Sequence, residues 1–212
     1  SVSYFIPDLA PEDLHRCEEI VRRSRFIVSL AHTPTPEAAK SFIERIKQEF
    51  PDATHNCWAY AAGAPGQTSN DDGEPHGTAG RPMLTMLLHG GVGELSAVVT
   101  RYFGGIKLGT GGLVRAYQGM VKLGLETLPT REHMIPARVE VVLDYPHITV
   151  FRRLLPDYRA TVASENFGVD ATYELLLPDQ NIPALETALT ELTDGAVLIT
   201  RLDDGTMPPE TP

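Results

Sequence analysis

The pattern of hydrophobic and polar positions is clearest between residues 91 and 128, where it predicts a strand, a turn and a helix. The apolar residues Leu95, Ala97, Val98 and Val99 are typical of a buried strand, which ends in the Arg-Tyr-Phe-Gly-Gly of residues 101–105. A glycine-rich turn follows at residues 108–112. Apolar residues then recur at the spacing of one packed helix face, namely Leu113, Val114, Tyr117, Met120, Val121 and Leu125.

The chain before this stretch predicts a mixture of strands, helices and one long loop. Alternation of apolar and polar residues predicts the strands, and Thr35 is the expected N-cap of a helix whose first residue is Pro36. The expected elements are an irregular lead-in (1–11), a strand pair (14–23 and 24–33), a helix from Pro36, a strand (55–60), a polar loop (63–82) and a short helix (83–88).

Beyond a linker that runs to about residue 138, the pattern changes. It predicts a strand (139–145), a helix (146–155), two strands (160–163 and 173–177), a helix (183–192) and a strand (197–202). This βαββαβ order is the ferredoxin-like arrangement. We expect an α+β fold with an N-terminal β/α domain at 1–135, a ferredoxin-like domain at 139–204 and a flexible tail at 205–212.

Charge is spread unevenly over the 212 residues, whose formal net charge is −10. This acidity argues against a general nucleic-acid coat protein, because such binding depends on neutralising phosphates. Residues 1–138 carry 14 Lys and Arg against 15 Asp and Glu, whereas residues 139–212 carry 4 against 13. An anionic partner is therefore expected on the N-terminal part.

The apolar segments and the cysteines indicate where in the cell the protein is expected. No apolar run approaches the roughly 20 residues that span a bilayer, and no signal peptide precedes residues 4–6. Two cysteines, Cys17 and Cys57, fit a reducing compartment better than a disulfide scaffold. We expect a cytoplasmic protein that does not enter the membrane and carries no cofactor.

The glycine-rich turn has the features of an anion site. Three cations surround it and no carboxylate lies between Glu94 and Glu126, while the first N–H groups of a helix attract negative charge. Glycines before a helix also serve tight turns alone, and neither the P-loop nor the GxGxxG pattern fits, so both interpretations stand. The predicted RNA- or phosphate-binding residues are Arg101, Tyr102, Gly104, Gly105, Lys107, Gly109, Thr110, Gly111, Gly112 and Arg115.

A second cationic cluster, residues 22–25 (Arg-Arg-Ser-Arg), lies between the first two predicted strands. Its simplest interpretation is a solvated strand edge, and the sharper one is an edge that faces RNA.

A separate group of residues supports an enzyme hypothesis. The candidates are His55 and Cys57 on one strand face, and Asp71, Asp72, Glu74 and His76 in the loop. Oxygen ligands with an imidazole suit Mg²⁺ or Mn²⁺, His with Cys suits zinc, and a Cys–His pair can act in nucleophilic catalysis. Neither HExxH nor paired CxxC spacing is present, so no metal site is predicted. The simpler interpretation is a buried thiol, a satisfied histidine and a solvated turn.

Several blocks recur in a familiar order: residues 24–27 (SRFI), 55–60 (HNCWAY), 71–75 (DDGEP), 77–80 (GTAG) with 82–84 (PML), and 101–112. The last begins with an Arg, two aromatics and two glycines. Together they cover about residues 14–128, and the chain resembles the IMPACT family, whose bacterial branch is known as YigZ.

This resemblance implies an N-terminal domain like domain IV of elongation factor G and a C-terminal domain like its domain V. Eukaryotic members carry an added N-terminal module and restrain a starvation-sensing kinase. The family block begins within about 20 residues of Ser1, so neither module nor kinase role is expected here. The resemblance implies a translation-associated protein that contacts RNA or the ribosome, or a protein partner of the translation machinery.

Three functions remain open from the sequence. The favoured one is a regulator that binds RNA or the ribosome through the glycine-rich turn, with Tyr102 or Phe103 stacking on bases. Alternation along the strand requires at least one of these rings to lie in the core. The alternatives are an adaptor that docks a protein through residues 66–82 and the acidic C-terminal domain, and a metal- or Cys/His-assisted hydrolase. We favour a binding or regulatory protein over an enzyme.

Overall fold

The computed structural model describes residues 2–62 and 68–203, and it separates the chain into two compact units. Tyr4–His133 forms the first, which we call the N-terminal unit. The described residues from Met134 onward, together with Val2 and Ser3, form the C-terminal unit. The predicted tail at 205–212 lies outside the described residues.

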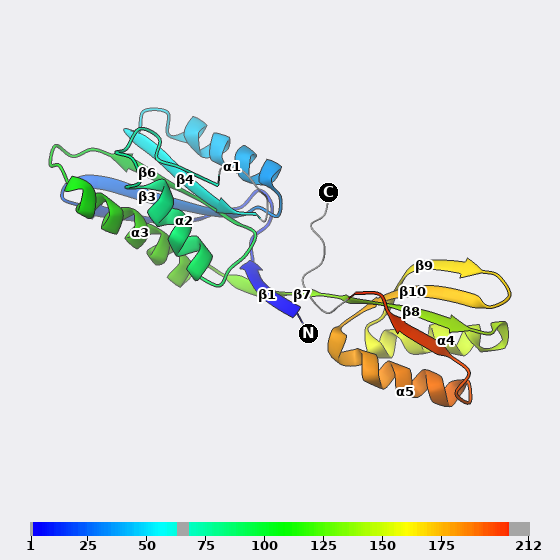
Figure 1. Cartoon of the computed structure of the whole chain (residues 1–212). Coiled ribbons are helices and arrows are strands. Elements are labelled where there is room, and N and C mark those ends of the chain that lie inside the picture. Colours follow the sequence, from blue (N-terminus) through cyan, green and yellow to red (C-terminus); the bar gives the residue numbers. More distant parts are fainter. Residues whose placement is uncertain (1, 63–67, 204–212) are drawn as a thin grey trace. The chain divides into compact units, whose positions relative to one another are not determined.

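The N-terminal unit is built on a five-stranded antiparallel sheet with the order β2-β3-β6-β4-β5. The strands are β2 (His15–Val21), β3 (Ser24–His32), β6 (Leu95–Tyr102), β4 (His55–Ala61) and β5 (Ser69–Asn70). One face is covered by α1 (Pro36–Glu49), and the other by α2 (Gly80–His89) and α3 (Gly109–Thr127) (Figure 1).

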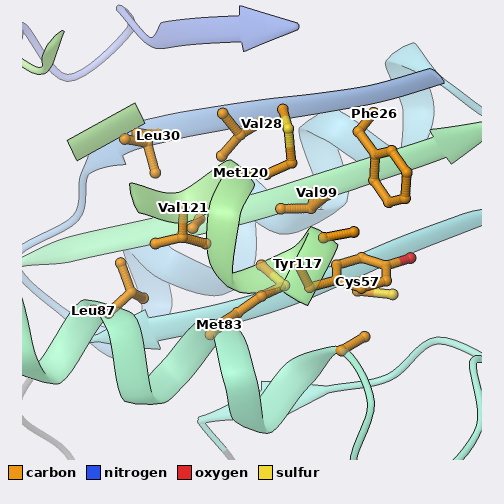
Figure 2. Close-up of a cluster of buried hydrophobic side chains, with 14 of the residues drawn as sticks. Phe26, Val28, Leu30, Cys57, Met83, Leu87, Val99, Tyr117, Met120 and Val121 are labelled. Atoms are coloured by element: carbon orange, nitrogen blue, oxygen red, sulfur yellow. The ribbon is translucent and has the colours of Figure 1, made fainter. Parts of the chain in front are cut away.

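The central strands are apolar on both faces because helices cover both faces. Figure 2 shows the larger core, in which Met83 of α2 and Met120 of α3 pack near Val28 and Val99 of the sheet. On the opposite face, Val98 packs with the apolar residues of α1. This two-sided burial explains why adjacent residues of β6, such as Ala97, Val98 and Val99, are all apolar instead of alternating with exposed polar residues.

The C-terminal unit has the element order βαββαβ around a four-stranded antiparallel sheet, β11-β8-β10-β9. Its strands are β8 (Ala137–Leu143), β9 (Thr161–Phe167), β10 (Ala171–Leu177) and β11 (Leu198–Arg201). Its helices are α4 (Ile148–Leu154) and α5 (Ile182–Leu192), with the 3₁₀ turns η1 (Tyr145–His147), η2 (Leu155–Tyr158) and η3 (Asp179–Asn181). The core contains Phe151 of α4 and Leu189 of α5 against Tyr173 of β10.

Most predicted elements are present, and local signals account for them. The predicted N-cap is confirmed, since the Thr35 hydroxyl accepts a hydrogen bond from the Ala38 amide at 3.1 Å. The predicted strands at 14–23, 24–33 and 55–60 correspond to β2, β3 and β4.

Two segments that the sequence predicts to be irregular are strands. The lead-in contains β1 (Val2–Pro7) and the linker after Pro129 contains β7 (Thr130–Ile135), and these two strands pair with each other. The prediction was wrong because each strand is short and its partner lies more than 120 residues away along the chain.

Two further boundaries differ. α2 begins at Gly80 rather than Met83, because the carboxylate of Asp71, nine residues before Gly80, caps it. β9 extends to Phe167 although residues 164–166 are polar, because it is an edge strand paired only with β10. In the part of the chain that the structure describes, no helix combines the length and apolar character that crossing a membrane requires.

Candidate nucleic-acid interface

Two arginines in a left-handed conformation form the turn between β2 and β3. Val21 pairs with Ser24, so Arg22 and Arg23 make up the whole loop, with φ angles of 46° and 66°. Two-residue hairpins of this type need positive φ at both positions and prefer Asn-Gly. A non-glycine residue in this conformation costs of order 1 kcal/mol. Two exposed arginines therefore occupy turn positions where Asn and Gly, which adopt positive φ with less strain, are usual.

The glycine-rich turn after β6 packs directly against this hairpin. A Cβ at Gly104 would lie 1.9 Å from the backbone oxygen of Arg23, so the approach requires glycine. The Gly104 amide also donates a hydrogen bond to Ser24 Oγ at 3.3 Å. Gly105 and Gly109 adopt φ angles of 90° and 77°, which permit the turn into α3. The two turns are therefore held together at one end of the sheet.

The N-terminus of α3 is exposed and positively charged. The helix begins at Gly109 with no side-chain cap and no acidic residue in its first turn. Gly109, Thr110 and Gly111 are exposed, which leaves unpaired amide N–H groups at the positive end of the helix dipole. The Arg115 guanidinium lies over this turn, since a Cβ on Gly111 would be 3.2 Å from Arg115 Nη1. Lys107 is exposed in the turn itself.

Four exposed cations gather around these turns, and we call them the basic surface: Arg22, Arg23, Lys107 and Arg115. Arg22 and Arg115 line one cavity of about 430 Å³ together with Leu108, the residue after Lys107. Among the described residues, none of the four cations forms an ion pair. Arg25, the other cation of the 22–25 cluster, differs because it pairs with Glu18 at 2.5 Å.

Arg101 does not belong to the basic surface, and the predicted patch of three uncompensated cations is wrong in this respect. Arg101 is only 6% exposed, and its Nη1 donates to Glu74 Oε1 at 2.5 Å. Its guanidinium lies 5.8 Å from the ring centre of Phe26 and 5.4 Å from that of Phe103. The counter-charge comes from a loop 27 residues earlier, which the absence of local carboxylates could not reveal.

Neither aromatic ring after Arg101 lies in the core, contrary to the expectation from alternation. Tyr102 is half-buried, and its hydroxyl donates to Asp52 Oδ1 at 3.0 Å. Phe103 is 46% exposed, because β6 ends at Tyr102 and the alternation ends with it. An exposed phenyl ring beside a cationic turn suits stacking against a nucleic-acid base.

The catalytic candidates His55, Cys57 and Glu74 do converge, but their polar atoms are occupied by the protein. The two ring nitrogens of His55 contact the Asp72 backbone oxygen at 2.8 Å and Glu74 Oε1 at 3.0 Å. Cys57 is fully buried beside Tyr117 (Figure 2), and its Sγ donates to the Asp71 backbone oxygen at 3.0 Å. Burial raises the pKa of this thiol, which disfavours the nucleophilic thiolate.

The two aspartates of the loop bind backbone amides, so this turn is not merely solvated. Asp71 caps α2 from outside, accepting hydrogen bonds from Ala79 and Gly80 at Oδ1 and from Gly77 at Oδ2. Asp72 Oδ2 accepts from the Asn56 amide at 2.7 Å. These contacts fasten the loop to β4 and α2.

The last candidate of this group, His76, is exposed and lines an open cavity of about 370 Å³ together with Arg81. The described residues contain no cluster of three or more His, Cys, Asp or Glu side chains arranged to hold a metal ion.

Replacing Asp71 by Asn is expected to lower the stability of the N-terminal unit by about 1 kcal/mol at pH 7, as for loss of a helix cap. Partial burial would raise the pKa of Asp71, but amide hydrogen bonds from Gly77, Gly80 and Ala79 outweigh it and lower that pKa. The stabilisation is therefore present above the ordinary carboxyl pKa of about 3.9 and is lost as pH falls through the lowered folded-state value.

Urea unfolding followed by fluorescence of Trp58, the only tryptophan, measures this effect in the N-terminal unit. The difference between the two proteins should shrink near pH 3. Asp13→Asn, at an exposed position of the same unit, is the control. An equal difference at both pH values would contradict the assigned role of the Asp71 charge.

Comparison with known proteins gives two family matches. Residues 22–125 match the family described as "Impact N-terminal domain", and residues 141–196 match "Domain of unknown function (DUF1949)". The chain is 39% identical over 201 residues to an "IMPACT family member" of Haemophilus influenzae, covering 93% of this chain and 98% of that protein.

Two more comparisons agree with these matches. The chain is 38% identical over 190 residues to "IMPACT family member YigZ" of Escherichia coli, covering 88% of this chain and 93% of the relative. A solved structure titled "Crystal structure of an hypothetical protein" is 37% identical, with a TM-score of 0.70 over 95% of this chain and 98% of that chain. The similarity extends over both units.

Proposed function

This chain belongs to the IMPACT family, and we propose that it binds single-stranded RNA through the basic surface, as a translation-associated regulatory protein. The observation that carries the proposal is the set of four exposed cations, none of which forms an ion pair with a described residue, around an uncapped helix N-terminus. Such a surface can hold phosphates with guanidinium groups, an ammonium group and backbone amides.

The acidity of the whole chain does not conflict with this proposal. The net charge of −10 arises almost entirely beyond residue 138, whereas residues 1–138 are close to neutral. Salt screens charges beyond about 8 Å at physiological ionic strength, so the local field governs contact with a phosphate.

Single strands fit this surface better than a duplex. Phe103 presents an exposed ring next to the cations, and unpaired bases stack on such rings in a sequence-tolerant way. The strained Arg22-Arg23 turn adds a second indication, because strained backbone persists where surrounding structure maintains it and often marks a functional position.

Fold-level likeness gives weaker, associational support. The βαββαβ order and the β11-β8-β10-β9 sheet of the C-terminal unit agree with a ferredoxin-like sandwich, as in domain V of elongation factor G. The N-terminal unit, by the same family resemblance, corresponds to domain IV of that factor. This likeness supports a ribosomal or RNA partner as part of the proposal.

The double variant Arg23→Glu/Lys107→Glu tests the proposal. We expect its affinity for a ten-nucleotide oligouridylate to fall at least tenfold, since two phosphate contacts become repulsive. Fluorescence anisotropy of a labelled oligomer measures the change. Arg101→Glu is unsuitable, because Arg101 is buried and a glutamate there would place a second carboxylate against Glu74.

The matched control is Lys40→Glu/Arg45→Glu, which makes the same charge change on the exposed side of α1, beyond the opposite face of the sheet. This control should retain the affinity of the unmodified protein within about twofold. Equal losses in the two double variants would refute the basic surface as the RNA contact, as would failure of the unmodified protein to bind at low salt.

A further inference from the structure

A groove runs between β2 and α3, next to the basic surface. On β2, Cys17, Glu19 and Val21 face α3, and Cys17 and Val21 pack against the core that α3 covers. The cavity of about 430 Å³ lies in this groove, and its volume falls within the range of small-molecule sites. β2 is the outer strand of the sheet, and Glu19, Arg115 and Gly119 are exposed, so the groove opens to solvent at the cavity. At its other end, His15 and Cys17 of β2 contact Thr127 of α3.

Small residues on α3 make one wall of the groove flat. Gly112, Ala116 and Gly119 follow the i, i+4, i+7 spacing of one helix face, and all three line the cavity. A Cβ at Gly119 would have no atom within 4 Å, so the space beside it is open. Leu108 and Ala116 are largely buried and give the floor an apolar character. A flat apolar wall of this kind suits the face of a planar ring.

Two cations and one carboxylate line the cavity, a combination that suits a ligand carrying both negative charge and N–H donors. Arg22 and Arg115 offer guanidinium groups that match phosphate oxygens. Glu19 also lines the cavity, and an ionised carboxylate only accepts hydrogen bonds. A ligand that was purely anionic would be repelled by Glu19, so the three groups together indicate a phosphate joined to a donor group.

Among the RNA bases, guanine best satisfies a single carboxylate. Its Watson–Crick edge presents two adjacent N–H donors, N1–H and the 2-amino group, which one carboxylate can accept together. Adenine and cytosine each place a ring acceptor beside their amino group, and uracil has one N–H between two carbonyls. A bidentate pair with a base edge favours that base by roughly 5- to 150-fold.

We propose that the groove between β2 and α3 binds one guanine nucleotide, with Arg22 and Arg115 on the phosphate and Glu19 on the guanine edge. The proposal rests on the proposed function, because it makes the groove the base-selective part of the RNA-binding surface. The ring lies against the flat wall of α3. The protein then prefers single strands that carry an unpaired guanine.

Nuclear magnetic resonance titration of the full ¹⁵N-labelled chain tests the groove without RNA. The probes are the monophosphates of guanosine, adenosine, cytidine and uridine, and inorganic phosphate. We expect guanosine monophosphate to shift the amide signals of Glu19, Gly112 and Gly119, with an apparent Kd about tenfold lower than that of the other nucleotides. Equal shifts from all four nucleotides, or from phosphate alone, would overturn the assignment of guanine.

Two variants test whether the preference for guanosine monophosphate arises in the groove. Gly119→Leu places a side chain in the open groove, and the fold should tolerate it because leucine favours helix over glycine. It should abolish the guanosine monophosphate shifts. Glu19→Gln should reduce the ratio of affinities for guanosine and uridine monophosphate to about one. Retention of the full preference by either variant would exclude the groove as its source.

The proposed function and the groove can fail separately. An oligouridylate with one central guanosine should bind about tenfold more tightly than oligouridylate alone, and Gly119→Leu should remove that difference. If Arg23→Glu/Lys107→Glu weakens both oligomers but no guanine preference exists, the basic surface stands and the groove proposal is wrong. If neither oligomer binds, the proposed function fails. The mononucleotide titration still shows whether the groove binds a guanine nucleotide.

Discussion

Replacing Glu74 by Gln is expected to destabilise the N-terminal unit by about 3 kcal/mol, because it leaves the Arg101 charge buried without a partner. The side chains of Glu74 and Arg101 are 1% and 7% exposed. Arg101 Nε has no hydrogen-bond partner among the described residues, so Glu74 provides most of the compensation. Glu74 also contacts His55, and the single substitution therefore weakens the link of the loop to both β4 and β6.

Urea unfolding followed by Trp58 fluorescence measures this change in the N-terminal unit. The control is Glu18→Gln, which removes the carboxylate of an exposed pair with Arg25 and should leave the midpoint unchanged. Glu74→Gln/Arg101→Met should recover part of the loss, since no unpaired charge then remains. A Glu74→Gln midpoint equal to that of the control would show that the buried pair does not stabilise the fold.

Replacing Gly104 by Ala is expected to be nearly as costly, at about 3 kcal/mol, and to weaken RNA binding as well. The added Cβ would lie 1.9 Å from the oxygen and 2.2 Å from the carbonyl carbon of Arg23. Both atoms belong to the backbone, so the hairpin turn must move as a whole. Arg22 and Arg23 would move with it, away from the α3 N-terminus.

Gly119→Ala is the control for this substitution, because its new methyl group meets nothing within 4 Å. It should leave stability unchanged or raise it by up to about 1 kcal/mol, as for glycine in a helix interior. The unfolding midpoint of Gly104→Ala should fall below that of this control, and its oligouridylate affinity should fall below that of the unmodified protein. A fully stable Gly104→Ala protein with unchanged affinity would contradict the close packing of the two turns.

Local signals in the sequence account for most of the fold. Thr35 and Pro36 mark the start of α1, and the apolar run of β6 reflects helices on both faces of the sheet. Pairing between distant segments leaves no such signal. Local pattern alone therefore predicts irregular segments where β1 and β7 pair. It also predicts a start of α2 three residues late, because the capping residue, Asp71, lies outside the helix.

The site was predictable only in part, for the same reason. Lys107 and Arg115 lie where the glycine-rich pattern predicts them, next to an uncapped helix. Arg101 could not be separated from them by sequence spacing, because its carboxylate partner comes from another loop. The Arg22-Arg23 cluster was visible as two adjacent cations between strands. Its contact with Gly104 depends on the fold, and so does its place beside α3.

The most direct measurement is the salt dependence of oligouridylate binding for the unmodified protein and for Arg23→Glu/Lys107→Glu. Each phosphate contact with a single strand contributes a slope of about −0.7 to the plot of log affinity against log salt concentration. If all four cations contact phosphates, the slope should be about −2.8. The variant keeps two of the four cations, so its slope should be no steeper than about −1.4. Equal slopes for both proteins would contradict phosphate binding by the basic surface.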